Sequence, residues 1–426
     1  MPENAYEVLV VGAGPAGLAA ACRAAESGGK VAVVDDNPRP GGQIWRSGAG
    51  KFAPGAVAWL ATAERRKVGF IAGARVFAAP APGRLALESF SQGEFEVSYR
   101  KLVLATGARE RFLPFPGWTL PNVMGAGGLQ ALAKAGLPLA GKKIAIAGSG
   151  PLLLAVAQYM RRHGADVRLV AEQAPQSALA RFGFSLARHP EKLIQAIGLR
   201  SSLFGIRYLT GCWPVAAMGG AKLECVTLRR GAKSWTEPCD YLACAFGLVP
   251  NLELAAVLGC RMTGTGVAVD EYQLSSVPDV YCAGEITGIG GLELSLVEGE
   301  IAGLAATGRI ETARRRFPGR QSGRRFAAEL ERAFALRPEL KLLPRPDTLV
   351  CRCEDVALAR IQSCRGWREA KLQTRCGMGP CQARVCGPAI EFLQGWKVES
   401  VRPPVFPAAV ESLIRASEGT RHGICQ

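Results

Sequence analysis

Four cysteines near the carboxyl end of this 426-residue chain have a spacing that could bind metal. One residue separates Cys351 from Cys353, and four residues separate Cys376 from Cys381. Thiolates hold both zinc and iron–sulfur clusters, but zinc sites usually place two residues between the cysteines of each pair. The spacing therefore leaves three alternatives: an iron–sulfur cluster, a zinc ion, and reduced cysteines with a structural role.

The loop that carries the second pair suits thiolate ligands. Gly377 and Gly379 can point backbone N–H groups toward the sulfurs, and Pro380 can begin a helix. Cys381 would then lie at a helix amino terminus, where the pKa of a thiol falls. Three arginines in this region can offset the negative charge of such a site: Arg352, Arg375 and Arg384.

The other thiols and the histidines show no catalytic arrangement. Cys364 and Cys386 are expected to pack as small hydrophobic residues. Cys239 and Cys244 flank and enter an apolar strand and are expected to lie in the core. Structural or surface roles are expected for the three histidines, which are His163, His189 and His422. We therefore assign no catalytic acid, base or redox dithiol to this chain.

A glycine-rich turn near the amino terminus predicts a dinucleotide site. The apolar run Val8–Val11 is typical of a strand and is followed by Gly12, Gly14, Gly17 and an alanine-rich helix pattern. The first glycine allows the turn, the second lets a pyrophosphate approach, and the third lets helix and strand pack closely. Asp35 ends the next strand, about 20 residues further on, where a carboxylate can bind ribose hydroxyls. The pattern indicates pyrophosphate and ribose, so another adenine nucleotide stays an alternative to FAD.

A related pattern follows in the middle of the chain. The apolar segment 143–147 leads into Gly148–Gly150, and a further strand ends at Glu172. Leu153 stands where the third glycine would be, and its side chain would push the helix from the strand or reorient it. We expect a second dinucleotide-binding fold whose occupancy by NAD(P) stays open, with Glu172 disfavouring a 2′-phosphate.

Composition and charge limit the class of protein. Apolar residues make up 48% of the chain, enough to bury sizeable cores, and the 52 basic and 36 acidic residues leave a net charge of +16. This charge favours anionic partners. The chain shows neither an apolar stretch of the ~18 residues that a membrane helix needs nor a secretory-signal pattern. We expect a cytoplasmic protein, at most peripheral to the membrane, whose cysteines stay reduced.

Arginines gather between residues 309 and 345, among few acidic residues. One interpretation is a solvated helical linker, and the other is a strip that docks an acidic partner subunit or a membrane surface. Nucleic acid is not expected as a partner, because no aromatic stacking pattern or known binding module accompanies the arginines.

Residues 5–308 resemble the two-dinucleotide-domain flavoprotein reductases. The resemblance rests on both glycine turns, on Ala105-Thr106-Gly107 after a buried strand, and on Gly284-Glu285 after another. It implies an α/β fold with two dinucleotide-binding, glutathione-reductase-like domains, to which the cysteine region adds a small helical 2Fe-2S domain. In that family the Ala-Thr-Gly turn closes the FAD domain, and the late Gly-acid pair approaches the ribityl chain and pyrophosphate. This chain has Glu285 where most relatives carry Asp.

The domain organisation expected on this basis has six segments. They are a FAD-binding domain (1–115) that is completed by a return segment (253–308), a second, NAD-type domain (116–252), a basic linker (309–345), a 2Fe-2S-binding domain (346–400) and a carboxyl-terminal tail (401–426).

Over nearly its whole length the sequence looks like the A (α) subunit of hetero-oligomeric flavin dehydrogenases. These include opine oxidase, D-hydroxyproline dehydrogenase and hydrogen cyanide synthase. The likeness rests on Pro40–Ile44, Glu110-Arg111, Pro114–Trp118, Gly148–Leu154 and Arg375–Gln382. The cysteine spacing is similar to the ferredoxin-like domain associated with bacterioferritin. The resemblance implies cofactor contacts from Gly12, Gly14, Pro15, Ala16, Gly17, Asp35, Asp36, Gly42, Gln43, Ala105, Thr106, Gly107, Gly284 and Glu285, and cluster ligation by Cys351, Cys353, Cys376 and Cys381.

The resemblance also implies partners. A β subunit of the amino-acid-oxidase type would bind its own FAD and oxidise a carbon–nitrogen bond, and family analogy leaves room for FMN at a subunit boundary and for a small γ subunit. A flavin beside an iron–sulfur centre forms an electron path, which favours a 2Fe-2S cluster over zinc.

The predicted function is electron transfer from the partner's flavin through the cluster to a quinone or another acceptor. The substrate would be an opine, D-hydroxyproline or a related amino or imino acid. Two alternatives stay open: a stand-alone NAD(P)H-dependent reductase with FAD and 2Fe-2S, and a nonredox scaffold that binds nucleotide.

Overall fold

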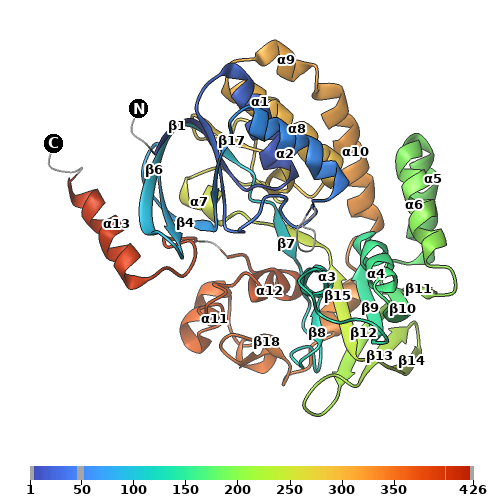
Figure 1. Ribbon diagram of the computed structural model, residues 1–426. Coiled ribbons are helices and arrows are strands. Elements are labelled where there is room, and N and C mark those ends of the chain that lie inside the picture. Colours follow the sequence, from blue (N-terminus) through green and yellow to red (C-terminus); the bar gives the residue numbers. More distant parts are fainter. Residues whose placement is uncertain (1–3, 46–51, 399, 423–426) are drawn as a thin grey trace. The chain divides into compact units, whose positions relative to one another are not determined.

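The computed structural model describes residues 4–45, 52–398 and 400–422 (Figure 1). The chain divides into two compact units. The first contains residues 1–109, 250–327 and 400–426, and the second contains residues 110–249 and 328–399. Among the described residues, no helix combines the length and apolar character needed to cross a membrane.

A seven-stranded sheet forms the centre of the first unit, in the order β3-β2-β1-β6-β5-β4, with β17 also pairing with β6. The strands are β1 (Ala5–Val11), β2 (Val31–Asp35), β3 (Gly69–Ala72), β4 (Ala74–Ala81), β5 (Arg84–Ser89), β6 (Gly93–Leu104) and β17 (Val280–Cys282). The β3-β2-β1-β6 and β6-β17 pairs are parallel, whereas β4, β5 and β6 form an antiparallel meander. Alternate residues of β1 enter two different buried clusters, so both of its faces are covered, as expected for a parallel strand.

Two helices of the first unit pack with their backbones in close approach. They are α1 (Pro15–Ala24) and α8 (Leu292–Ala306), which run side by side in Figure 1. A Cβ atom on Gly299 would lie 2.2 Å from the Ala16 carbonyl oxygen, and one on Gly303 would lie 2.1 Å from the Ala20 carbonyl oxygen. Glycine at both positions therefore lets α8 hold the helix that follows the first glycine turn.

The remaining helices of this unit include the arginine-rich segment. They are α2 (Pro54–Arg65), α7 (Glu253–Val257), the 3-10 helix η3 (Gly284–Thr287), α9 (Ile310–Arg314), α13 (Val410–His422) and the first part of α10 (Phe317–Ala333). The segment is helical, as expected, but not simply solvated. Arg316 pairs with Glu300 at 3.2 Å, and Arg324 pairs with the buried carboxylate of Glu298 at 3.1 Å. Arg320 is itself buried and donates to the Glu271 carbonyl.

A five-stranded parallel sheet forms the centre of the second unit, in the order β11-β10-β9-β15-β8. Its strands are β8 (Val123–Gly125), β9 (Lys143–Ser149), β10 (Asp166–Glu172), β11 (Arg207–Thr210) and β15 (Tyr241–Phe246), and its helices are α3 (Ala126–Lys134), α4 (Leu152–Arg162), α5 (Gln176–Ser185) and α6 (Pro190–Ser202). The three strands β12 (Cys212–Met218), β13 (Cys225–Arg230) and β14 (Lys233–Pro238) form an antiparallel sheet, and β7 (Ala108–Glu110) pairs with β16 (Leu248–Pro250).

The carboxyl-terminal part of the second unit is small and rich in turns. It contains β18 (Leu349–Cys351), β19 (Val356–Ala357), α11 (Trp367–Thr374) and α12 (Cys386–Gln394) around a core of its own. Two sheets of dinucleotide-binding type and a cysteine-rich helical region confirm the fold class predicted from the sequence.

Candidate dinucleotide site and cysteine cluster

The first glycine turn is so tight that side chains would not fit. Gly12 has a φ of +108°, and a Cβ atom there would lie 2.2 Å from the carbonyl oxygen of Ala105. A Cβ atom on Gly17 would lie 1.7 Å from the Gly12 carbonyl oxygen. The turn thus lies directly against the end of β6, and α1 lies directly against the turn, which leaves the amino terminus of α1 available to a phosphate.

Asp35 fixes this turn from the carboxyl end of β2. One carboxylate oxygen accepts a hydrogen bond from the Ala13 N–H at 2.6 Å, and the other accepts from the backbone and side-chain N–H groups of Asn37 at 2.8 and 2.7 Å. The acid expected to bind ribose is therefore held in place by the loop beside it, and its residue stays half-buried.

Two further glycines close around the start of α1. Gly42 has a φ of +57°, and a Cβ atom there would lie 2.9 Å from the Cα atom of Gly14. A Cβ atom on Gly284 would lie 2.7 Å from the Ala16 side chain. Segments from three distant parts of the sequence therefore meet at the glycine turn without side chains between them.

The other residues expected at the cofactor have mixed environments. Thr106 donates its hydroxyl to the Asn251 carbonyl at 2.7 Å, so it braces the loop. Glu285 is half-buried, and burial raises the pKa of its carboxyl. Gln43 is exposed, whereas Pro15 is buried as the first residue of α1.

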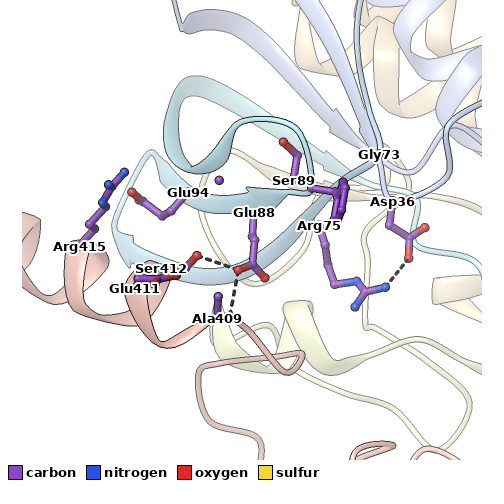
Figure 2. Close-up of a pocket in the computed structure, with 12 residues that line it drawn as sticks. Asp36, Gly73, Arg75, Glu88, Ser89, Glu94, Ala409, Glu411, Ser412 and Arg415 are labelled. Atoms are coloured by element: carbon purple, nitrogen blue, oxygen red, sulfur yellow. Dashed lines mark hydrogen bonds and ion pairs between the residues drawn. The ribbon is translucent and has the colours of Figure 1, made fainter.

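Asp36 lies at the edge of a hollow rather than in the glycine turn. The hollow has a volume of about 810 Å³ and lies between the β4–β6 meander and α13. Figure 2 shows Asp36 there, paired with Arg75 at 3.8 Å, while Glu88 accepts hydrogen bonds from the Ala409 N–H and the Ser412 hydroxyl. Glu88 thereby caps the amino terminus of α13.

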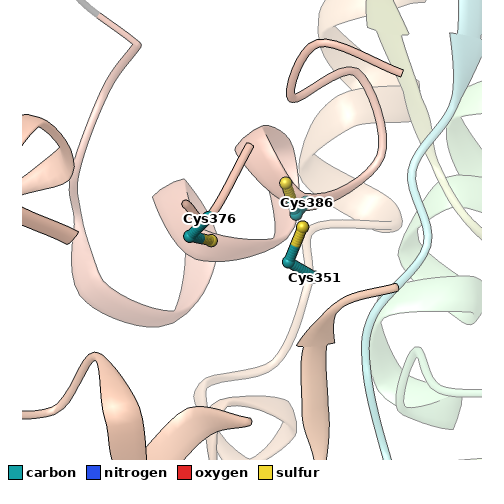
Figure 3. Close-up of side chains that lie close together, drawn as sticks. All are labelled: Cys351, Cys376 and Cys386. Atoms are coloured by element: carbon teal, nitrogen blue, oxygen red, sulfur yellow. The ribbon is translucent and has the colours of Figure 1, made fainter. Parts of the chain in front are cut away.

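The cysteines gather in the small carboxyl-terminal core. The sulfur atoms of Cys351, Cys376 and Cys386 all lie within 4.8 Å of one another and are buried (Figure 3). The thiols of Cys353 and Cys381 lie close enough to shift each other's pKa, and Cys386 likewise shifts the pKa of Cys381. Two of the four predicted ligands, Cys351 and Cys376, thus lie in the buried triad with Cys386, whereas Cys353 and Cys381 lie beside it. We call these five thiols the cysteine cluster.

Backbone N–H groups point at the sulfurs of this cluster. Gly377 N–H donates to the Cys351 sulfur at 3.5 Å. The N–H groups of Glu354, Cys381 and Val385 lie near the sulfurs of Cys351, Cys353 and Cys381, and each acts to lower the pKa of the thiol beside it. Such N–H···S bonds favour thiolates over thiols, and they tune the potential of iron–sulfur centres.

The loops around the cluster contain unusual backbone conformations. Four non-glycine residues have positive φ values: Asp355, Arg375, Gln382 and Ala383. Non-glycine residues adopt this region at a cost, and such residues concentrate at functional sites. A Cβ atom on Gly379 would lie 2.3 Å from the Cys353 Cβ atom, so the loop also packs tightly on the first cysteine pair.

The electrostatics of the thiols follow from their contacts. Hydrogen bonds with Cys376 and Cys386 lower the pKa of Cys351, and the bond with Cys386 lowers the pKa of Cys381. The contact with Cys351 raises the pKa values of both Cys376 and Cys386. The thiols therefore titrate as a coupled group rather than independently.

Two details of the sequence interpretation are wrong. Pro380 does not begin a helix, because α12 begins at Cys386, and Cys381 lies in the preceding turn. Cys386 is buried but is not merely a packing residue, because it contacts the cluster at the first position of α12. The regular spacing of Cys376, Cys381 and Cys386 was the signal that could have identified it. By contrast Cys239 and Cys244 lie in the core, and burial raises their pKa values.

The second glycine turn carries a fully buried acid. Leu153, the second residue of α4, packs in the core. Glu172 at the end of β10 accepts hydrogen bonds from Gly150 N–H and Ala174 N–H, each at 2.8 Å. Burial raises the pKa of Glu172 to about 7.

This shift predicts a pH dependence of stability. The folded protein binds the Glu172 proton more tightly than the unfolded chain, so this group costs nothing below pH ~4.5 and lowers the free energy of unfolding as pH rises toward 7. The loss is on the order of 3 kcal/mol. Glu172→Gln should flatten the dependence in that window, as measured by urea unfolding at pH 4.5, 6 and 7.5. An unchanged slope would contradict the prediction.

The fold and the cysteine cluster define a flavoprotein-type oxidoreductase subunit with a thiol-rich carboxyl-terminal region. Residues 6–315 match the family model described as pyridine nucleotide-disulphide oxidoreductase. The A (α) subunit of opine oxidase from Rhizobium meliloti (strain 1021) is 33% identical over 95% of this chain and 97% of its own length. Hydrogen cyanide synthase subunit HcnB of Pseudomonas aeruginosa is 32% identical over 89% of this chain and 90% of its own. The chain therefore belongs to the pyridine nucleotide-disulphide oxidoreductase family and, within it, to the group formed by the opine oxidase A (α) and HcnB subunits.

Solved structures agree on the fold. The structure of L-proline dehydrogenase from P. horikoshii has a TM-score of 0.67 and 18% sequence identity, and the match covers 96% of this chain and 79% of that one. At this identity the likeness shows the fold alone.

Proposed function

We propose that this chain is the electron-transfer subunit of a hetero-oligomeric dehydrogenase that oxidises the carbon–nitrogen bond of an opine, D-hydroxyproline or a related amino or imino acid. The observation that carries the proposal is the cysteine cluster, joined in one chain to a fold of FAD-binding type. Relatives named as subunits of opine oxidase and hydrogen cyanide synthase support both the chemistry and the need for partners. The oxidation itself would take place on an FAD-containing partner of the amino-acid-oxidase type.

The first glycine turn fits FAD. A pyrophosphate needs close approach to backbone N–H groups at a helix amino terminus, and Gly12, Gly14 and Gly42 provide a surface without side chains there. Asp35 lies at the position from which a carboxylate can reach a ribose, and its second role is to hold the Ala13 N–H. FAD bound here would supply a redox centre within this chain.

The cysteine cluster fits a 2Fe-2S centre better than zinc. Four thiolates are needed, five thiols are present, and backbone N–H groups already point at three of the sulfurs. We propose Cys351, Cys353, Cys376 and Cys381 as the four ligands. Cys386 is a fifth thiol that lies close enough to take the position of one of them. A 2Fe-2S centre bound here would supply one-electron transfer.

The surroundings of the cluster suit exchange with an external acceptor. Cys351, Cys376 and Cys386 are shielded from water, while Cys353 is exposed and Cys381 half-exposed. A quinone or another acceptor could therefore approach the cluster from the exposed side, where Cys353 lies. Nearby, Arg375 pairs with Glu354 at 2.7 Å, so the charge of this arginine is already compensated by an acid of the same loop region.

A metal and sulfide analysis tests the proposal. The protein purified without oxygen should contain about two irons and two acid-labile sulfides per chain. It should also absorb visible light beyond the flavin bands and give an electron paramagnetic resonance signal after reduction with dithionite. One zinc per chain without iron would contradict the 2Fe-2S assignment.

A further inference from the structure

The second glycine turn contacts a stretch of the chain's own backbone. The Ser149 hydroxyl, within the turn, donates to the Phe334 carbonyl oxygen at 2.8 Å. The Gln173 side chain, just after β10, donates to the Ala335 carbonyl oxygen at 3.1 Å and accepts from the Arg337 N–H at 3.1 Å. We call residues Phe334–Arg337, which follow α10 in the second unit, the plug segment.

Ser149 and Gln173 lie where a dinucleotide would bind. In this fold a pyrophosphate binds at the glycine turn after the first strand, and the adenosine ribose binds at the carboxyl end of the second strand. Ser149 is the last residue of β9, Gln173 directly follows β10, and the two side chains bond to each other at 2.9 Å. The carbonyl groups of the plug segment therefore accept hydrogen bonds from a polar side chain at the pyrophosphate position and from another at the ribose position.

Side chains hold the plug segment on either side. The Phe334 ring packs edge-on against Phe182 of α5, with ring centroids 5.5 Å apart. The Arg337 guanidinium lies 5.1 Å from the centre of the Trp213 ring. Leu340, three residues further on, is fully buried in the same core as Trp213. The plug segment is thus packed firmly against this edge of the sheet.

The two glycine turns differ in how their acids are placed. Both acids accept backbone N–H bonds on both carboxylate oxygens, but Asp35 is half-buried whereas Glu172 has no exposed surface. A ribose hydroxyl could reach the Glu172 carboxylate only if the atoms that cover it moved away. The second turn therefore lacks the acceptor that the first turn retains near its surface.

We propose that the plug segment takes the place of the adenosine half of a dinucleotide in the second crevice, so that this chain does not bind NAD(P)H. The inference goes beyond the proposed function, because it concerns a separate crevice and would hold whether or not the cysteine cluster carries iron.

Binding of ADP-ribose and NADH to the FAD-loaded full-length chain tests the inference. The double variant Ser149→Ala/Gln173→Ala removes the side chains that hold the plug segment. The control Ser201→Ala/Gln158→Ala removes the same residue types elsewhere in the unit, where they bond to Gly198 and Ser202. Calorimetric titration should detect ADP-ribose binding that is at least about tenfold tighter to the double variant than to the wild type or the control, because affinity scales with the open fraction.

Phe334→Ala provides a second test that leaves Ser149 and Gln173 intact. Hydrogen exchange at the Arg337 amide should accelerate in Phe334→Ala and in the double variant, which shows that the plug segment is loosened. ADP-ribose should bind more tightly to Phe334→Ala than to the wild type. The inference is overturned if the wild type binds ADP-ribose or NADH as tightly as these variants do, or if a loosened plug segment brings no gain in affinity.

Discussion

Replacing Cys351 with serine should remove the iron and abolish electron transfer to external acceptors. Cys351 is buried in the cysteine cluster, within 4.8 Å of two other sulfurs, and accepts a hydrogen bond from the Gly377 N–H. A serine hydroxyl stays protonated where a thiolate is required, so we expect iron per chain to fall from about two to nearly zero. Dye-linked activity of the assembled complex should fall by more than about 100-fold, beyond the effect typical of changes outside the ligand shell.

The matched control is Cys364→Ser. Cys364 is buried in the same small core, but its sulfur lies 3.9 Å from the Gln373 side chain and outside the cluster. This variant should keep its iron and most of its activity. In Cys351→Ser the partner's flavin should still be reduced by substrate, because the proposed function places oxidation of the substrate on the partner subunit. Intact dye-linked activity in Cys351→Ser would instead support a nonredox scaffold.

Single serine variants of the five thiols identify the ligands. If Cys353, Cys376 and Cys381 complete the set, Cys386→Ser should retain iron, and each of the other four variants should lose it. Retention of iron in Cys376→Ser together with loss in Cys386→Ser would move the fourth ligand to the start of α12. Either result can be checked by iron content and by the visible spectrum of the reduced protein.

Local patterns in the sequence predicted the parts of the fold that depend on local geometry. The tight packing at Gly17 was predictable because a side chain there would meet the Gly12 carbonyl oxygen within the same short segment. Leu153, which stands where the third glycine of the pattern would be, belongs to α4 and is fully buried. These features require only neighbouring residues to be known.

Features that depend on distant residues were missed. The position of Cys386 depends on where α12 begins, and positive φ values at Gln382 and Ala383 delay that beginning beyond Pro380. The ion pairs of Arg316 and Arg324 depend on acids of α8, which only the folded chain brings close. Composition could show an excess of arginine but not which arginines face buried carboxylates.

Replacing Gly12 with alanine should prevent FAD binding and destabilise the first unit. The new Cβ atom would lie 2.2 Å from the Ala105 carbonyl oxygen, which belongs to backbone and cannot rotate away. Alanine at a φ of +108° adds conformational strain, and together we expect a loss on the order of 3 kcal/mol in unfolding free energy. The displaced turn would also move the N–H groups that approach the pyrophosphate. FAD affinity should fall by at least about 100-fold, equivalent to roughly 2.7 kcal/mol.

Gly28→Ala separates collision from conformational strain. Gly28 also has a positive φ, +83°, but a Cβ atom there would meet no atom within 4 Å. This variant should lose only about 1–2 kcal/mol, the usual cost of the left-handed conformation, and should bind FAD normally. The comparison requires urea unfolding and titration of the FAD-free proteins with FAD. If Gly12→Ala binds FAD as well as Gly28→Ala does, close contact between this turn and the end of β6 is not what shapes the cofactor site.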